Sequence, residues 1–407
     1  MFDLSRHPLF RPWTDPISGV TSYLLVEHVA PVQLSLPSPY SGVSRDERWL
    51  WFVCAHPPNR QRSLGVVCLD PATPEIHHFP QAGFSGRAPL VAPEGESVYF
   101  CSGARVYQMT VRGHYSEVCT LPADYVAGRE LWRLSSYCSC SADGRYLLLD
   151  GLVGHHSFVA IGDLASGRVD VIREFQAHHG NAQFAPDDAR RLLIAQLPRR
   201  DPVSGLNLEA VLRLHQMELG GANYHCLTPH IPSDRRHGIS FEWWTAQGEV
   251  AYIDRETGIW VIDAETHRHR HVWQEALCHG DIDSTGRYMC ADKDPLRWYE
   301  HPMGVLFYDS GRQRGVDIDS GMPTPIYKRG DLAVEPVPRF SPQGSWVVYT
   351  STRGGGVDLA LCSTNDLREE LNRLSALEAE FDTGTESEVA DDIGTATSTG
   401  SSRLWGV

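Results

Sequence analysis

The chain has 407 residues, of which 42% are hydrophobic and 21% charged, and its formal net charge is −15. This length can bury a large core, and the acidity argues against nucleic acid as a partner. No apolar run approaches the roughly 18 residues of a membrane-spanning helix, and residues 1–13 lack the basic and apolar regions of a signal peptide. We therefore expect a cytoplasmic protein without a nucleic-acid or membrane partner. The ten cysteines are unevenly spaced and several fall in apolar runs, which predicts buried, reduced thiols.

The first predicted strand spans residues 20–32 and follows the turn Asp15-Pro16-Ile17-Ser18-Gly19. From there the chain repeats one unit, a polar turn that leads into a short apolar strand. The clearest copy is 341–351, where Pro342 fixes its own φ and Gly344 can take a positive one. Seven such strands are marked by Trp49, Val98, Tyr146, Leu192, Val250, Tyr288 and Trp346, at intervals of 38 to 58 residues.

Short strands repeated at this period are typical of propeller blades, which must pack side by side because one blade cannot bury both of its faces. We therefore predict an all-β fold, a seven-bladed β-propeller in a single domain of residues 1–370. The strand at 20–32 is expected to pair with the last blade and close the ring, since an open ring would expose sheet edges. Residues 371–407 are expected to form a disordered acidic tail rich in Ser, Thr and Gly, after a short helix around Asn365–Leu377.

Two histidine pairs lie in polar segments between predicted strands. His155 and His156 precede the strand at 158–163, and His178 and His179 precede another turn-and-strand unit. In a propeller such positions can meet at one face of the central channel. Neutral histidine can accept a proton near pH 7, so these four residues are candidate general bases. The alternative is that they are loop residues that hydrogen-bond to the backbone. Tyr137 is a candidate proton donor, or a packing residue.

Cationic and aromatic residues suggest an anionic sugar as ligand. Arg236 and His237 lead into a segment with Trp243; guanidinium groups bind carboxylates, and indole rings cover sugar rings. Arg213 lies within an apolar strand, so it either reaches solvent or faces the channel. The alternative for the first group is a solvated turn followed by a core strand.

A possible metal site combines Cys278 and His279 with Cys290 on the next predicted strand and Glu335 further along. Cysteine, histidine and carboxylate together can bind zinc or another transition metal. The spacing matches no closed zinc motif. We therefore consider a divalent metal, Zn, Mn or Ca, as a candidate cofactor.

Several of these segments resemble the propeller-type polysaccharide lyases. The run 335–342, Cys278-His279 ahead of 283–286, and Ser240-Phe241-Glu242-Trp243-Trp244 are similar to motifs of the oligogalacturonate lyases. Asn181 to Pro186, followed by 201–205, looks closer to the ulvan lyases. The resemblance covers most of residues 10–365.

These families cleave uronate glycans by β-elimination, and the resemblance implies the same reaction here. The oligogalacturonate lyases bind a metal through a His-Pro-His-Pro run and a further histidine. This chain keeps that histidine as His279, but has Glu335 and Val337 where the paired histidines would stand. Phe241 occupies the position of the family's base histidine, and Asn181 that of a histidine on the ulvan-lyase side.

We therefore predict a lyase that cleaves an anionic, uronate-containing oligosaccharide or polysaccharide. His156 or His179 would be the base, Tyr137 the acid, and Arg213 with Arg236 would neutralise the carboxylate. His237, Trp243 and Asn181 would contribute to binding. The alternative is a catalytically inactive propeller that binds a glycan or a protein partner, and a third reading is a hydrolase on the same scaffold.

Overall fold

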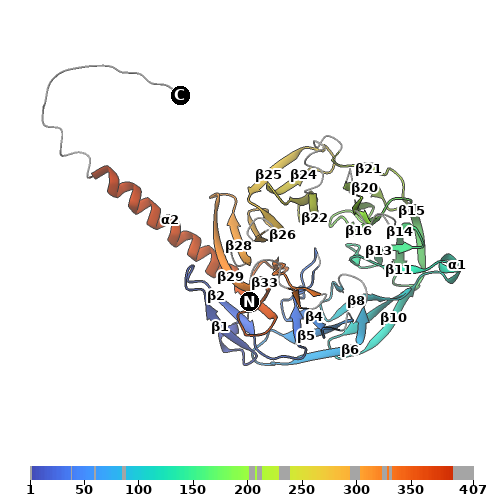
Figure 1. The fold of residues 1–407 in the computed structure, drawn as a ribbon, viewed down its shortest axis with the longest axis horizontal. Helices are drawn as coiled ribbons and strands as arrows, with labels where there is room; N and C mark the ends of the chain where they lie inside the picture. The colour runs from blue at the N-terminus through green and yellow to red at the C-terminus, as the bar shows by residue number, and fades with distance from the viewer. Residues whose placement is uncertain are drawn as a thin grey trace, which may run out of the picture.

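The chain forms a ring of seven antiparallel sheets around a central axis (Figure 1). The structure, a computed structural model, describes residues 2–37, 39–58, 61–84, 89–200, 207–208, 213–228, 239–293, 303–322, 328–329 and 332–387. The seven-bladed β-propeller predicted from the repeat is confirmed.

Each blade is a sheet whose strands follow one another outward from the axis. Blade 1 comprises β3 (Val32–Leu34), β4 (Trp49–Ala55), β5 (Arg62–Cys68) and β6 (Ile76–Phe84). Blade 2 comprises β7 (Leu90–Val91), β8 (Ser97–Ser102), β9 (Arg105–Thr110) and β10 (Tyr115–Thr120). Blade 3 has a first strand split into β11 (Leu131–Leu134) and β12 (Ser139–Cys140), then β13 (Tyr146–Val153), β14 (His156–Asp163) and β15 (Val169–Phe175).

The next three blades follow the same order. Blade 4 comprises β16 (His179–Phe184), β17 (Arg191–Gln196), β20 (Leu214–Glu218) and β21 (His225–Cys226). Blade 5 comprises β22 (Ile239–Trp244), β23 (Val250–Asp254), β24 (Gly258–Ile262) and β25 (His269–Gln274). Blade 6 comprises β26 (Leu277–Ile282), β27 (Tyr288–Lys293), β28 (Met303–Asp309) and β29 (Arg314–Met322).

Blade 7 joins the two ends of the chain. Its strands from the C-terminal part are β32 (Arg339–Phe340), β33 (Trp346–Ser351) and β34 (Asp358–Ser363), and β2 (Thr21–Leu25) and β1 (Phe10–Thr14) continue the sheet. Ser22 lies opposite Cys362 in the antiparallel β2–β34 pair. The predicted closure of the ring by an N-terminal strand is confirmed.

The seven marker residues all fall in the second strands of the blades, at or next to their first residues. These strands are almost entirely buried; in β4 and β33, for example, every residue is buried. The turn before β33 has the predicted geometry, since Gly344 takes a φ of 72°. A turn that reverses the chain before an apolar strand thus explains the repeat, because the second strand packs on neighbouring blades from both faces.

Two aspartates tie neighbouring blades together from the same position of the second strand. Asp150 on β13 accepts hydrogen bonds from the backbone N–H of Ser136 in its own blade (2.7 Å) and of Ala182 in the next (3.1 Å). Asp292 on β27 accepts from the N–H of His279 (2.7 Å) and from that of Val337 in the next blade (3.1 Å). Both carboxylates are fully buried, and each satisfies backbone groups where a first strand is irregular.

The remaining elements lie outside the seven blade sheets. They are η1 (Leu4–Arg6), α1 (Ala123–Val126), α2 (Thr364–Ser387) and two small hairpins, β18 (Arg199–Arg200) with β19 (Asn207–Leu208) and β30 (Lys328–Arg329) with β31 (Leu332–Ala333).

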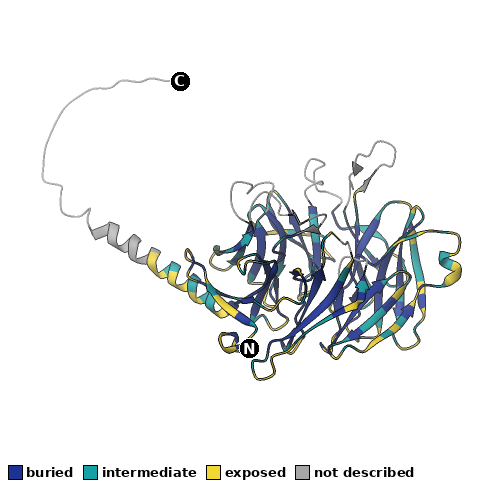
Figure 2. Cartoon of the chain, turned by 60° about the horizontal axis from the view of Figure 1, so that its bottom comes forward, coloured by how far each residue is buried: buried dark blue, intermediate teal, exposed yellow. Residues whose placement is uncertain are grey.

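Helix α2 begins against blade 7 and then points away from the ring (Figure 2). Its start coincides with the predicted helix, but it continues to Ser387, so the expected tail boundary at residue 371 falls inside it. In the part of the chain that the structure describes, no helix has the length and apolarity to cross a bilayer. All ten cysteines are free, and eight of them are buried, as the sequence predicts.

Candidate active site

The strand directions define two faces of the ring. The first strand of each blade begins at one face, which we call the upper face, and turns into the second strand at the opposite, lower face. The second strand returns to the upper face, where the third strand begins. His179, His279 and Arg133 lie at or near the starts of first strands, and Arg213 directly precedes the third strand of blade 4. These residues therefore share the upper face.

Several first strands are irregular at this face and place residues in the left-handed region. Ser135, Asn181, Phe241 and Val337 have φ values between 45° and 62°. The pairing register shifts between Gly180 and Gln183 in blade 4 and again around Phe241 in blade 5. A bulge re-aims side chains, and backbone strain of this kind concentrates at functional sites.

A buried ion pair joins blades 4 and 5 at the upper face. The Arg213 Nε donates to Glu242 Oε2 at 2.8 Å, and the Asn181 Nδ2 donates to Glu242 Oε1 at 2.7 Å. The Glu242 side chain is fully buried, and that of Arg213 is 12% exposed. The carboxylate fixes the guanidinium from one side, and two of the three residues, Arg213 and Asn181, belong to the predicted site.

His279 is the centre of a second polar group. Its Nδ1 lies 2.8 Å from Asp292 Oδ2, while its Nε2 lies 3.6 Å from Glu335 Oε2 and 3.9 Å from the Cys278 Sγ. Ligand atoms of Cys278, His279 and Asp292 lie within 4.8 Å of one another. Asp292 thus joins this group, whereas Cys290 packs in an apolar cluster of blades 6 and 7.

These side chains fit a divalent metal, but Asp292 would hold His279 in place and would not bind the ion itself. Both Asp292 oxygens already accept backbone N–H groups, so this carboxylate holds the Nδ1–H of His279 and directs the Nε2 lone pair towards Cys278 and Glu335. Burial lowers the pKa of His279, but the Asp292 carboxylate and the Cys278 thiol outweigh it and raise that pKa well above its usual value. The carboxylates around this imidazole therefore favour a positive charge, carried by a proton or a metal.

The two groups are in contact through Phe241. Its ring meets the His279 ring edge-on, with the centroids 4.2 Å apart, and it is the chain neighbour of Glu242. The Arg339 guanidinium lies 5.4 Å from the Phe241 ring centroid and donates to the Gly280 carbonyl. Where the family resemblance places a base histidine, this chain therefore has an aromatic ring that packs on the candidate metal ligand.

The two predicted histidine pairs come together between blades 3 and 4. The His179 N–H donates to Ser157 Oγ at 3.0 Å, directly beside His156. His156 Nε2 lies 3.2 Å from Gln176 Oε1, and His178 Nδ1 lies 3.0 Å from the Pro198 carbonyl. His155 is exposed at the turn between β13 and β14.

His179 is the most enclosed of the four and has a tyrosine partner. Its Nδ1 donates to the Ala177 carbonyl (2.9 Å), so its Nε2 accepts the hydroxyl of Tyr224 (2.7 Å). His215 stacks on Tyr224 with the ring centroids 4.7 Å apart, and its Nδ1 lies 3.4 Å from the Arg213 carbonyl. Burial lowers the pKa values of His179 and His215 to about 4. Both are neutral at pH 7, and His215 lies next to the backbone of Arg213.

The other predicted residues have different surroundings. Tyr137 is buried next to the split first strand of blade 3. Trp243 is 2% exposed and packs in the apolar cluster of blade 5. Arg236 and His237 lie outside the described residues.

Sequence reasoning did not select Asp292, Glu242 or Tyr224 as site residues. Asp292 could have been selected because it is a carboxylate inside an otherwise apolar strand. It follows its blade's marker residue by four positions, as Asp150 does in blade 3. Tyr224 carries no such signal, since its neighbours come from another part of the chain.

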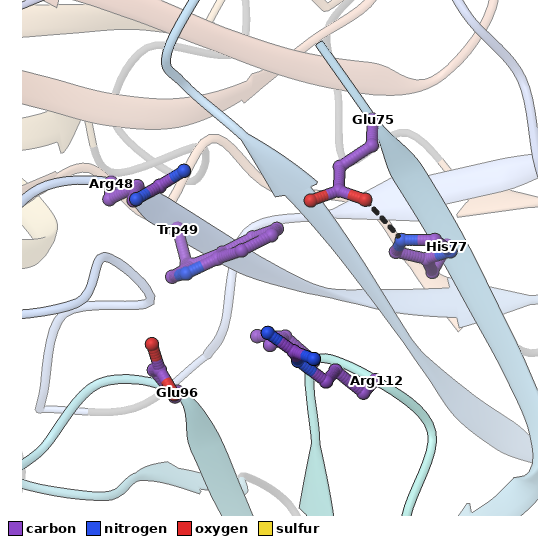
Figure 3. Close-up of a pocket in the computed structure, with 7 residues that line it drawn as sticks. Arg48, Trp49, Glu75, His77, Glu96 and Arg112 are labelled. Carbon is purple, nitrogen blue, oxygen red and sulfur yellow. Dashed lines mark hydrogen bonds and ion pairs between the residues drawn. The ribbon is translucent and has the colours of Figure 1, made fainter. Parts of the chain in front are cut away.

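A separate cavity of about 380 Å³ opens at the lower face between blades 1 and 2. It is lined by Arg48, Trp49, Glu75, His77, Glu96, Val111 and Arg112. Figure 3 shows Arg48 and Arg112 on either side of the Trp49 indole, with Glu75 paired to His77. Its walls mix cations and carboxylates, and none of the predicted site residues lies there.

Comparison with protein-family models and with curated proteins finds no match to this sequence. Among solved structures, an oligogalacturonate lyase in complex with manganese is similar, with a TM-score of 0.68 and 16% identity; the match covers 87% of this chain and 96% of that one. An oligogalacturonate lyase from Vibrio parahaemolyticus has a TM-score of 0.68 and 14% identity over the same shares of the two chains. At these identities the likeness establishes the propeller fold.

Proposed function

We propose that this protein is a lyase that cleaves uronate-containing oligosaccharides or polysaccharides by β-elimination. The observation that carries the proposal is one continuous set of contacts on the upper face. It runs from His179 through Tyr224 and His215 to Arg213, and on through Glu242 and Phe241 to His279. A neutral base, a fixed cation and a candidate metal ligand are thus linked, in that order, through Tyr224, His215, Glu242 and Phe241.

Each group has a role in the reaction. Arg213, oriented by Glu242, would neutralise the substrate carboxylate and so make the C5 proton more acidic. His179, neutral at pH 7, would take that proton through the Tyr224 hydroxyl, which passes its own proton to the Nε2. His155, His156 and His178 are the other candidate bases. The electron pair forms the C4–C5 double bond as the C4–O bond breaks. The leaving oxygen takes a proton, for which Tyr137 stays the predicted donor.

His279 and Glu335, with Cys278 beside them, would hold a divalent metal. Imidazole and thiol ligands favour Zn, whereas the Glu335 carboxylate suits Mn, and Ca binds mostly oxygen. A bound metal would supply further positive charge for the uronate carboxylate. Asp292 would fix the orientation of His279 in either case.

The test is an ultraviolet assay of the conjugated unsaturated uronate with a panel of uronate polymers and oligomers, in the presence of Mn²⁺ or Zn²⁺. We expect absorbance to rise with one glycan class and to be abolished in Arg213→Lys, which keeps the charge but not the planar fork. Metal content measured on His279→Ala should fall relative to the wild type.

A glycan-binding propeller without activity is the second candidate, and a specific observation favours it. Phe241 and Val337 replace two histidines expected from the resemblance; Val337 is buried and Phe241 half-buried. Calorimetric binding of a uronate oligomer by folded, metal-loaded protein, without any absorbance change across the panel, would establish this reading and overturn the lyase.

A further inference from the structure

Trp132 and Arg133 form an unusual pair at the start of the first strand of blade 3. In the β11–β13 pair, Leu131 lies opposite Val153 and Arg133 opposite Leu152, so the register shift leaves Trp132 without a partner. Its side chain is 62% exposed. Among the described residues, it is the only strongly exposed large hydrophobic side chain on a first strand, the strand nearest the axis. The bulge turns an indole outward at the upper face.

Arg133 is held in place but not fully hydrogen-bonded. Its Nη2 lies 3.6 Å from Asp150 Oδ1, and its side chain is 19% exposed. Asp150 already accepts the N–H groups of Ser136 and Ala182, and within the described residues the Nε and Nη2 of Arg133 have no hydrogen-bond partner. The Ser136 Oγ is likewise buried without one. Buried polar atoms without partners are uncommon, and a hydrogen-bond acceptor on a ligand could satisfy those of Arg133.

Gly180 places this group next to the candidate active site. A Cβ at that position would lie 2.9 Å from the Arg133 Nη2 and 2.8 Å from the Ser136 Oγ, so a side chain there would displace both. The next residue is Asn181, which hydrogen-bonds to Glu242, the partner of Arg213. Arg133 thus extends the polar network to blade 3, on the side away from His279.

We propose that Trp132 and Arg133 form a second subsite, which binds another uronate unit of the oligosaccharide whose first carboxylate meets Arg213. This inference rests on the proposed function. Arg133 receives the second carboxylate through a charge-assisted hydrogen bond, and the Trp132 indole packs on the pyranose ring. The protein should therefore favour substrates long enough to span both positions.

The experiment compares a uronate disaccharide with a tetrasaccharide, in the wild type and in the variants Trp132→Ala and Arg133→Gln. We expect each variant to lower kcat/KM for the tetrasaccharide about tenfold, mainly through KM, and to change the disaccharide value less than about twofold. Tyr115→Ala, an exposed aromatic on blade 2, and Arg129→Gln, an arginine paired with Glu174, are the matched controls and should behave as the wild type.

The outcomes separate the subsite from the proposed function. Unchanged tetrasaccharide kinetics in Trp132→Ala, or equal losses for both substrates in both variants, would overturn the subsite while the lyase stands. If the wild type binds uronates without cleaving them, the same comparison is made with dissociation constants, and the same length-dependent loss supports the subsite although the lyase fails. A wild type that neither binds nor cleaves any uronate overturns both. Trp132 is at the surface, so its variant should fold.

Discussion

At the scale of single residues, the ion pair between Arg213 and Glu242 combines a role in binding with one in stability. Glu242 is fully buried, so Arg213→Ala would leave a buried carboxylate with Asn181 as its one side-chain partner among the described residues. Removing one partner of a buried pair typically costs about 3–5 kcal/mol. We expect a loss of this size in the free energy of unfolding, measured by urea denaturation.

The double variant Arg213→Ala/Glu242→Gln should recover most of that loss, because it removes the unpaired charge. Arg191→Ala is the matched control: its partner Asp187 is 52% exposed, so the pair should contribute less than about 1 kcal/mol. If Arg213→Ala lowers the free energy of unfolding no more than Arg191→Ala does, the buried pair does not exist in solution.

The buried imidazoles predict a pH dependence with a definite sign. The pKa of His179 is lowered by burial from 6.5 to about 4, so the unfolded chain binds its proton first as pH falls. The contribution of the neutral His179 imidazole to the free energy of unfolding is therefore fully present above pH 6.5, and it is lost as the pH falls from 6.5 to 4. His179 alone should account for roughly 3 kcal/mol, since one pKa unit corresponds to about 1.4 kcal/mol.

His179→Asn should flatten the dependence of unfolding free energy on pH between 6.5 and 4. Calorimetric melting at several pH values measures this dependence, with His155→Asn, at the exposed turn between β13 and β14, as the control. An equal slope in the wild type and His179→Asn would contradict the neutral, buried state of this imidazole.

Part of the site followed from residue types and part required the fold. The sequence predicts His279, Glu335, Arg213 and the histidine pairs, because these residues are chemically conspicuous where they occur. It does not show that Glu242 orients Arg213 or that Asp292 orients His279. Those contacts cross between strands or blades, so no local spacing encodes them.

At the scale of elements, the first half of helix α2 completes a core and the rest extends beyond it. Leu367 and Leu371 are fully buried against blades 6 and 7. Leu371→Ala should cost about 2–5 kcal/mol of unfolding free energy, because it leaves a cavity in this cluster. Glu369→Ala on the exposed side of the same turn should change stability by less than about 0.5 kcal/mol. Equal melting temperatures for both variants would mean that the helix does not dock.

The strands were more predictable than this helix, and the reason is burial. Second strands are covered on both faces, so their sequences are apolar throughout and the seven markers identify them. The helix beyond residue 377 has no such continuous pattern, and its end at Ser387 was not predicted. First strands are short and interrupted by bulges. The alternation of apolar and polar residues therefore does not predict which of their residues take left-handed backbone conformations.

At the scale of the whole molecule, the ring depends on the contact between its two ends. Blade 7 takes strands from both, with Ser22 on β2 opposite Cys362 on β34. A cysteine at position 22 would therefore face a native thiol across an antiparallel pair, where Cα separations of about 4.5–5.5 Å suit a disulfide. Tyr349 donates a hydrogen bond to Ser22 at 2.8 Å, and its loss should cost only about 1 kcal/mol.

We expect Ser22→Cys to form this disulfide on oxidation and to raise the unfolding free energy, because the bond links segments 340 positions apart. The chain-entropy model gives about 6 kcal/mol for a loop this long, less any strain. Thiol titration in denaturant should count two thiols fewer than in the reduced variant, and the melting temperature should rise only without reductant. Tyr23→Cys, opposite Leu361, is the control and should keep its thiol. Because each blade contacts mainly its neighbours, breaking the β2–β34 pair would free both ends of the ring. If the disulfide does not form in Ser22→Cys, or forms equally in Tyr23→Cys, the two strands pair in another register.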